Sequence, residues 1–195
     1  MRRLLLASSN TGKLAELRPL LADTGLELVA QSELGVQDAV EDGLSFVENA
    51  LIKARHACRQ AGLPALADDS GLVVDALGGA PGLISAHYAG VHGDGPGNIA
   101  RVLRELEGVP DGRRTARFHC TLVLLRHAED PQPLIAEGSW EGRILRAPRG
   151  DQGFGYDPIF LPEGGDLTFG EMEPAAKDAI SHRARAFAKL KAALL

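Results

Sequence analysis

The succession of apolar runs and amphipathic stretches restricts the possible folds of this chain more than any other feature. Residues 3–7 and 26–30 are short apolar runs typical of strands, whereas 12–22 and 45–62 repeat apolar residues at helical spacing. Residues 64–77 read as a strand, a polar interruption and a second strand. Strands that alternate with helices in this way predict parallel β-α-β units.

The second half of the chain has a different pattern. Residues 116–127, 133–140 and 141–148 read as three strands joined by short turns, which predicts antiparallel hairpins. A charged, alanine-rich stretch around 175–194 predicts a C-terminal helix. The two halves together predict an α/β fold with a mixed, elongated and twisted central sheet flanked by helices.

Length and composition predict one domain. The chain has 195 residues, of which 45% are hydrophobic and 24% charged, as in an ordinary globular protein large enough for a sizeable core. We find no repeat and no linker that would separate independent domains. We therefore expect a single domain over residues 1–195, with two lobes and an active-site cleft between them.

The charge balance argues against a nucleic-acid polymer as partner. The formal net charge is -5, whereas such binders spread basic charge over a broad face. The apolar run after Arg3 is shorter than the roughly 7–15 residues of a secretory signal. No stretch approaches the roughly 20 apolar residues of a membrane span. Because Cys58 and Cys120 lack C-x-x-C spacing, we expect reduced thiols and a cytoplasmic protein. The lack of a long apolar stretch predicts that the protein has no membrane partner.

The segment SSNTGK at 8–13 lies between the first predicted strand and the first predicted helix. It is not a P-loop, because Ala7 stands where glycine is needed and Leu14 stands where serine or threonine would contact magnesium. The free N–H groups of a helix N-terminus, together with Lys13, can nevertheless bind phosphate. The alternative is a simple helix cap with the lysine exposed to water.

Acidic residues cluster in LADDSGL, where Asp68 and Asp69 directly follow an apolar run. In an extended chain these neighbours point to opposite faces, so one can face a ligand while the other braces the turn. Glu41 precedes the second predicted helix, and Lys53 lies on it. If these groups meet beside the opening loop, the carboxylates need a cation, and oxygen ligands favour Mg²⁺. The alternative is a surface turn.

Five segments together resemble the inosine triphosphate pyrophosphatases, also called XTP/dITP pyrophosphatases. They are 8–13, 41–55, 67–82, 152–160 and 177–186, and they occur in the same order over nearly the whole chain. Any one of them is a weak signal, but five in register are specific.

The resemblance implies a homodimeric, Mg²⁺-dependent enzyme. Such an enzyme hydrolyses nucleoside triphosphates between the α and β phosphates, with the nucleotides ITP, dITP and XTP as favoured substrates. This chain departs from the pattern at His87, where many relatives carry arginine, and at Ala176, where an acidic residue is common.

The resemblance also implies roles for individual positions. Glu41, Asp68 and Asp69 would hold the metal, and Asp69 would be the catalytic base that activates water. The substrate would be contacted by Ser8, Ser9, Asn10, Thr11, Gly12, Lys13, Lys53, Ser70, Phe154, Gly155, Tyr156, Asp157, Lys177, His182 and Arg183.

The residue types suit a purine. Phe154 offers a flat face, and stacking contributes roughly 1–3 kcal/mol per base. Hypoxanthine and xanthine carry a 6-oxo acceptor where adenine carries an amino donor, so fixed donors such as His182 or Arg183 would disfavour adenine. For Phe154, the alternative is a core aromatic side chain in a turn. For residues 181–186, the alternative is a helix N-cap followed by arginines exposed to solvent.

Two other functions fit parts of the sequence. One is a pyrophosphatase of the Maf type, but those proteins typically begin with Ser-x-Ser-x-Arg, whereas this chain has Asn10 and Lys13. The other is a module that senses nucleotides without cleaving them. A binder of polyanions gains little from three carboxylates unless they position a metal, so we favour the enzyme.

Overall fold

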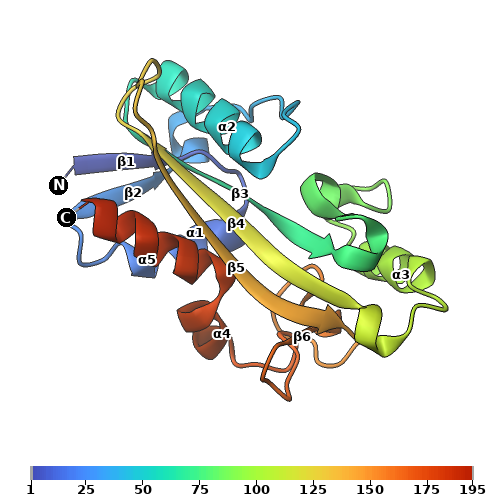
Figure 1. The fold of residues 1–195 in the computed structure, drawn as a ribbon. Coiled ribbons are helices and arrows are strands. Elements are labelled where there is room, and N and C mark those ends of the chain that lie inside the picture. Colours follow the sequence, from blue (N-terminus) through green and yellow to red (C-terminus); the bar gives the residue numbers. More distant parts are fainter. Residues whose placement is uncertain (1, 195) are drawn as a thin grey trace. The chain divides into compact units, whose positions relative to one another are not determined.

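The computed structural model describes residues 2–194, which form an α/β structure (Figure 1). The strands are β1 (Arg2–Leu6), β2 (Leu26–Ala30), β3 (Ala65–Val74), β4 (Thr115–Leu125), β5 (Leu134–Ile144) and β6 (Phe160–Pro162). The helices are α1 (Thr11–Leu20), α2 (Phe46–Ala61), α3 (Gly95–Glu105), α4 (Pro174–Ile180) and α5 (His182–Leu194).

The strands form one sheet of mixed direction, in the order β2-β1-β3-β4-β5-β6. β1 pairs in parallel with both β2 and β3, so that Leu5 lies opposite Val29 on one side and Ala65 on the other. β5 and β6 pair antiparallel, with Gly142 opposite Pro162. The predicted α/β fold with a mixed sheet and flanking helices is confirmed.

The chain divides into two compact units. Unit 1 comprises Met1–Asp69, Cys120–Gly138 and Arg183–Leu195, and unit 2 comprises Ser70–His119 and Ser139–His182. β3, β4 and β5 each begin in one unit and end in the other. The single domain and the cleft between two lobes stay predictions.

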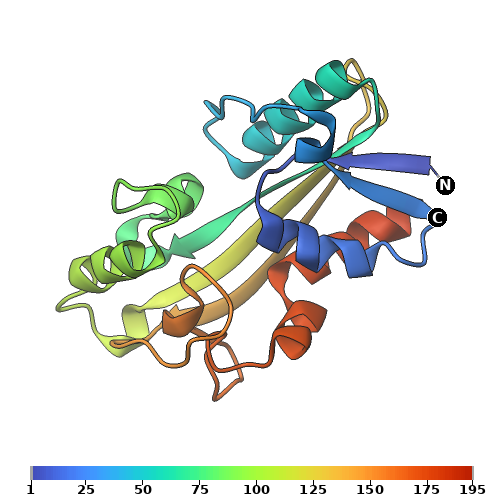
Figure 2. The ribbon, with the colours of Figure 1, turned by 180° about the vertical axis from the view of Figure 1, so that it is seen from behind.

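In unit 1, alternate residues over β1 and Ala7, which follows it, pack into different apolar clusters. Leu4 and Leu6 belong to the cluster that includes residues of α1 and α5, whereas Leu5 and Ala7 belong to the cluster of α2. Both views show α1 and α5 on one side of β1 and β2, and α2 on the other (Figures 1 and 2). Successive side chains of a strand point to opposite faces, so a continuous apolar run suits a strand covered on both sides.

The core of unit 2 is aromatic. Phe118 stacks on Phe169 at 5.6 Å between ring centroids and meets the edge of Phe160 at 4.8 Å. Trp140 contacts Phe169 edge-on at 4.9 Å. Aromatic pairs in such geometries stabilise a core beyond the area that they bury.

Two predicted breaks inside strands are wrong. β3 continues through Asp68 and Asp69, because both carboxylates find cationic partners and the polar pair need not leave the strand. β5 is continuous over the stretch that we expected to be two strands. Its Gly142 lies against β6, where an added Cβ would come within 2.4 Å of the Leu161 carbonyl oxygen. That glycine serves close strand contact rather than a turn.

The predicted C-terminal helix is interrupted. α4 ends before Ser181, whose backbone is extended with ψ of 164°, and α5 begins at His182. Serine disfavours helix interiors because its hydroxyl can form hydrogen bonds with nearby backbone groups. Here the hydroxyl of Ser181 donates to the carbonyl oxygen of Asp178 at 3.5 Å. The break places two separate helix ends next to the SHR segment.

Candidate active site

The opening loop leads into α1 through a hydrogen-bonded cap. The Oδ1 atom of Asn10 accepts a hydrogen bond from the backbone N–H of Lys13 at 3.1 Å, and Ser8 Oγ accepts one from the Asn10 N–H at 3.2 Å. Thr11 and Gly12 occupy the first two helical positions, whose N–H groups lack helical partners. The cap is present, but Lys13 is not exposed, since only 14% of its side chain is accessible.

The ammonium of Lys13 is held by Asp68. Its Nζ lies 2.5 Å from Asp68 Oδ1 and donates to the Asp68 backbone oxygen at 3.2 Å. The other oxygen of Asp68 accepts hydrogen bonds from Arg183 Nε at 2.7 Å and from the Cys120 thiol at 3.2 Å. Burial alone would raise the pKa of Asp68, but Arg183 and Lys13 hold this pKa well below its usual range.

Arg183 is buried, with 2% of its side chain exposed. Besides Asp68, its Nη1 contacts the carboxylate of Glu16, one turn after Lys13 on α1. Burial lowers the pKa of Arg183, but the charges of Asp68 and Glu16 outweigh this effect and raise it. Glu16 is a residue that sequence reasoning missed; its i, i+3 spacing from Lys13 was the available signal.

Asp69 faces a different partner from its neighbour. Its Oδ1 accepts a hydrogen bond from Lys53 Nζ at 2.7 Å, and the same ammonium lies 2.9 Å from Glu41 Oε2. Burial raises the pKa of Asp69, and Lys53 opposes this only in part. The pKa of Lys53 is raised, because the two carboxylates outweigh the effect of burial. The two aspartates therefore contact different cations, but neither braces a turn, because β3 is continuous there. That one of them faces a ligand stays a prediction.

The three predicted metal ligands all contact cationic side chains of the protein. Among residues 2–194 there is no group of three His, Cys, Asp or Glu side chains placed to hold a metal ion. Metal binding by Glu41, Asp68 and Asp69 stays a prediction, and Glu41 and Asp69 are the pair that shares one ammonium. Within the described part of the chain, the buried Oδ2 of Asp69 has no hydrogen-bond partner, and such an oxygen is costly unless a cation or water reaches it. These donors suit Mg²⁺.

A further acid supports the opening loop. Asp38 Oδ2 accepts a hydrogen bond from Ser9 Oγ at 3.0 Å, and its Oδ1 contacts the amide of Gln31. Sequence reasoning did not single out Asp38. It lies 29 positions after Ser9, and no local spacing connects the two.

In unit 2, Phe154 is half-exposed and stands on a tightly built turn. Asp157 Oδ2 accepts hydrogen bonds from the Phe154 N–H at 2.9 Å and from Lys177 Nζ at 2.7 Å. That oxygen would lie 2.0 Å from a Cβ on Gly153, so only glycine fits there. Gly155 has φ of 61°, which also favours glycine. Lys177 lies 5.0 Å from the centre of the Phe154 ring.

The remaining predicted contacts in unit 2 are buried or half-buried. The Tyr156 hydroxyl donates to the Ser85 carbonyl at 2.7 Å, which gives this residue a structural partner. The His182 ring stacks on Phe118 at 5.1 Å between centroids. Ser70 is half-buried and follows Asp69 on β3.

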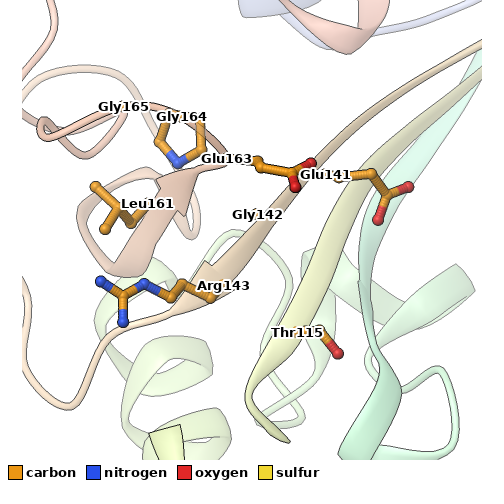
Figure 3. Close-up of a pocket in the computed structure, with 9 residues that line it drawn as sticks. Thr115, Glu141, Gly142, Arg143, Leu161, Glu163, Gly164 and Gly165 are labelled. Atoms are coloured by element: carbon orange, nitrogen blue, oxygen red, sulfur yellow. The ribbon is translucent and has the colours of Figure 1, made fainter. Parts of the chain in front are cut away.

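The structure thus gathers the predicted site residues into two groups. Unit 1 holds the triphosphate and metal candidates together with Arg183, and unit 2 holds the nucleoside candidates. A hollow of about 440 Å³ between β5, β6 and the turn after β6 is lined by Glu141, Arg143 and Glu163 among others (Figure 3). None of the predicted site residues lines it.

Comparison with known proteins identifies the family. A sequence model of the Ham1 family matches residues 4–193. The chain belongs to the Ham1 family. The dITP/XTP pyrophosphatase of Xanthomonas campestris pv. campestris is 62% identical over 191 residues, which cover 98% of this chain and 96% of the relative. The predicted family is confirmed.

Solved structures of Ham1 proteins have the same fold. A HAM1 protein from Coxiella burnetii matches with a TM-score of 0.93 and 49% identity, over 100% of this chain and 98% of that one. A nucleoside-triphosphatase / dITP/XTP pyrophosphatase from Mycobacterium abscessus matches with a TM-score of 0.80 and 48% identity, over 96% and 98%.

Proposed function

We propose that this Ham1 protein hydrolyses the deaminated purine nucleotides ITP, dITP and XTP at the bond between the α and β phosphates. The products are the nucleoside monophosphate and pyrophosphate, and the reaction removes these nucleotides from the pool. The observation that carries the proposal is a pair of ionic contacts at neighbouring residues of β3 in unit 1. Lys13 pairs with Asp68, and Lys53 pairs with Glu41 and Asp69. Relatives named dITP/XTP pyrophosphatase support the same activity.

The triphosphate binds at the opening loop. The N–H groups at the start of α1 carry partial positive charge, and Lys13 and Lys53 add two full charges. Transfer of a phosphoryl group is accelerated mainly by positioning and by neutralising charge on the phosphate oxygens. Both lysines are held in place by carboxylates, so the cations are pre-positioned.

Asp69 is the base for the attacking water. It takes a proton from water while the water oxygen bonds to the α phosphorus, and the bond from that phosphorus to the bridging oxygen breaks. The electron pair leaves with pyrophosphate. Lys53 holds Oδ1 of Asp69 and leaves Oδ2 available, and burial makes this carboxylate a stronger base than an exposed one. Magnesium held by Glu41 and Asp69 would neutralise charge on the phosphate oxygens.

The nucleoside stacks on Phe154. The ring is half-exposed, and its turn is held by Asp157, which accepts hydrogen bonds from the Phe154 N–H and from Lys177. His182, held against Phe118, is the candidate donor to the 6-oxo group. A site built to donate to that oxygen leaves a donor unpaired when adenine binds, which selects against ATP.

The cellular setting follows from the same proposal. An enzyme that cleans the nucleotide pool acts in the cytoplasm, and we propose that it works there as a homodimer. Within the part of the chain that the structure describes, no helix is both long and apolar enough to cross a membrane.

The test is to incubate the protein with Mg²⁺ and a panel of triphosphates and to identify the products. We expect pyrophosphate and monophosphate from ITP, dITP and XTP, with much slower release from ATP. Orthophosphate as the only inorganic product would place cleavage at another bond. Preferential turnover of dTTP or UTP would favour the Maf-type alternative, and tight binding without products would favour a sensing module.

A further inference from the structure

A buried polar network in unit 2 connects the turn that carries Phe154 to the start of α3. Tyr156, two residues after Phe154, is 4% exposed, and its hydroxyl donates a hydrogen bond to the backbone oxygen of Ser85 at 2.7 Å. The same oxygen accepts a hydrogen bond from Nδ2 of Asn98 at 3.4 Å. Asn98 lies near the start of α3 and is 3% exposed. One carbonyl oxygen therefore joins the turn to the helix.

The amide of Asn98 holds the loop 85–89 with both of its polar atoms. Its Oδ1 accepts a hydrogen bond from the Ala89 N–H at 2.7 Å, and its Nδ2 also donates to the Ala86 carbonyl oxygen at 3.3 Å. Without this side chain, the backbone groups of the loop would have to shift or to find water as partners. Asn98 therefore fixes the place of the Ser85 carbonyl.

Ser85 joins the same loop to β3. Its Oγ accepts a hydrogen bond from the Leu72 N–H at 3.0 Å and donates one to the Gly82 carbonyl oxygen at 2.6 Å. Leu72 is fully buried and follows the predicted substrate contact Ser70 by two positions on β3. A strand and a helix thus hold the loop, which gives the Tyr156 hydroxyl a fixed acceptor.

The position of the Phe154 ring depends on how the backbone of its turn is held. Because the ring is half-exposed, core packing fixes it only in part. The start of α3 also lies close to the turn, since an added Cβ on Gly95 would be 3.9 Å from the Gly155 carbonyl oxygen. Burial raises the pKa of Tyr156, so its hydroxyl keeps its proton and remains a donor at neutral pH.

We infer that Asn98 and Ser85 are positioning residues for the surface on which the base stacks. They act through the hydroxyl of Tyr156, which holds the turn of Phe154 in place. The inference rests on the proposed function, because it takes Phe154 as the stacking partner of the base. It gives α3 and the loop before it a part in substrate binding that no sequence motif indicated.

The network acts on one end of the substrate. A displaced stacking surface weakens binding of the base, whereas in the proposed function the phosphate groups bind at residues of unit 1. Damage to the network should therefore raise KM for ITP and leave pyrophosphate binding unchanged. The value of kcat should change little, because no reacting group is altered.

The experiment compares two variants that each remove one buried tyrosine hydroxyl. Tyr156→Phe loses the hydrogen bond to Ser85 and keeps the ring. Tyr88→Phe is the matched control, because Tyr88 is also 4% exposed and lies in unit 2, but its hydroxyl donates to Glu105. Kinetics measure KM and kcat, and calorimetry measures pyrophosphate binding. We expect Tyr156→Phe to raise KM for ITP about fivefold, with kcat within about twofold of the wild type. Tyr88→Phe should match the wild type.

Two combinations test the route of the effect. Asn98→Ala should raise KM about tenfold, and adding Tyr156→Phe to it should have less than about a twofold further effect, because both act through the same carbonyl oxygen. In a Phe154→Ala background, Tyr156→Phe should likewise add less than about twofold, because the surface that it positions is already gone. Urea unfolding checks that each variant is folded, and Tyr156→Phe keeps the test valid if Asn98→Ala is not.

Four outcomes would overturn the inference. They are a wild-type KM in Tyr156→Phe, an equal rise of KM in Tyr88→Phe, full additivity of Tyr156→Phe with Phe154→Ala, and weakened pyrophosphate binding by Tyr156→Phe. Failure of the proposed function gives a different result. In that case the wild type releases no pyrophosphate from ITP, or Phe154→Ala alone leaves KM unchanged.

Discussion

Asp68 and Asp69 are chemically identical neighbours, yet the structure gives them opposite environments. Asp68 lies between two cations, and its pKa is lowered. Asp69 has one buried oxygen that no group of residues 2–194 hydrogen-bonds, and burial raises its pKa. The alternation of side chains along β3 separates them, so one acid anchors Lys13 while the other remains available for proton transfer.

Replacing Asp69 by asparagine should lower the turnover of ITP at least about a thousandfold, because the variant has no base. Nucleotide binding should largely survive. Single-turnover kinetics and calorimetry measure the two effects. Asp23→Asn, an exposed acid of the same unit that pairs with Lys191, serves as the comparison and should retain turnover. Near-wild-type rates in Asp69→Asn would remove the proposed base.

Replacing Phe154 by alanine should raise KM for ITP roughly 10- to 100-fold, because stacking contributes roughly 1–3 kcal/mol per base. Tyrosine at this position should restore most of the affinity, since it keeps an aromatic face. Leu167→Ala, which removes another exposed apolar side chain of unit 2, should leave KM unchanged. If Phe154→Ala also has the wild-type KM, the base lies elsewhere.

The sequence predicts the surroundings of some site residues better than those of others. Lys13 and the two aspartates stand in recognisable contexts, at a strand-to-helix loop and after a strand. Arg183 is different, because its partner Glu16 lies 167 positions away and no local pattern connects them. The sequence shows that a helix begins near Arg183, but only the folded chain decides whether the guanidinium meets water, base or carboxylate.

Among the elements, the turn between β4 and β5 depends strongly on one side chain. Asp130 accepts hydrogen bonds from the Arg126 N–H at 3.0 Å, the Arg126 guanidinium at 2.7 and 2.8 Å, and the Gln132 N–H at 3.0 Å. The side chain and backbone of Arg126 are the main causes of the lowered pKa of Asp130. The ionised acid therefore stabilises this turn.

Asp130→Asn should lower the urea midpoint near neutral pH, and the difference from the wild type should shrink as the pH falls. A carboxylate with a lowered folded pKa stabilises the fold above its unfolded pKa of about 3.9 and loses this contribution as the pH falls toward the folded value. Urea unfolding at pH 7, 4 and 2.5 measures it. Glu129→Gln, an exposed change in the same turn, should show a smaller difference. If the difference in urea midpoint between variant and wild type is the same at all three pH values, the destabilisation comes from the changed shape of the side chain and not from its charge.

Elements with strong periodicity were predicted well, and their interruptions were not. The apolar run of β1 and the amphipathic pattern of α2 are confirmed, because burial on defined faces selects them. The breaks expected in β3 and β5 followed from polar and glycine residues that are usual in turns. Here tertiary partners satisfy Asp68 and Asp69, and close strand contact requires Gly142, so long-range packing overrides the local preference.

Considered as a whole, the protein matches its relatives over almost all of its length. That it forms a homodimer is a proposal, which the mass of the assembly tests. We expect sedimentation at micromolar concentration to give twice the 20.6 kDa mass of one chain. Dilution should show whether activity falls as the assembly dissociates. A mass of one chain together with full activity would contradict the dimer.

Both thiols of the molecule, Cys58 and Cys120, are buried, and Cys120 lies against the carboxylate of Asp68. Burial and that negative charge raise the pKa of the Cys120 thiol well above its usual range, which suppresses the reactive thiolate. Modification by a thiol-specific reagent therefore requires the fold to open around these residues. The two cysteines can therefore serve as internal probes of native-state opening, without an added label.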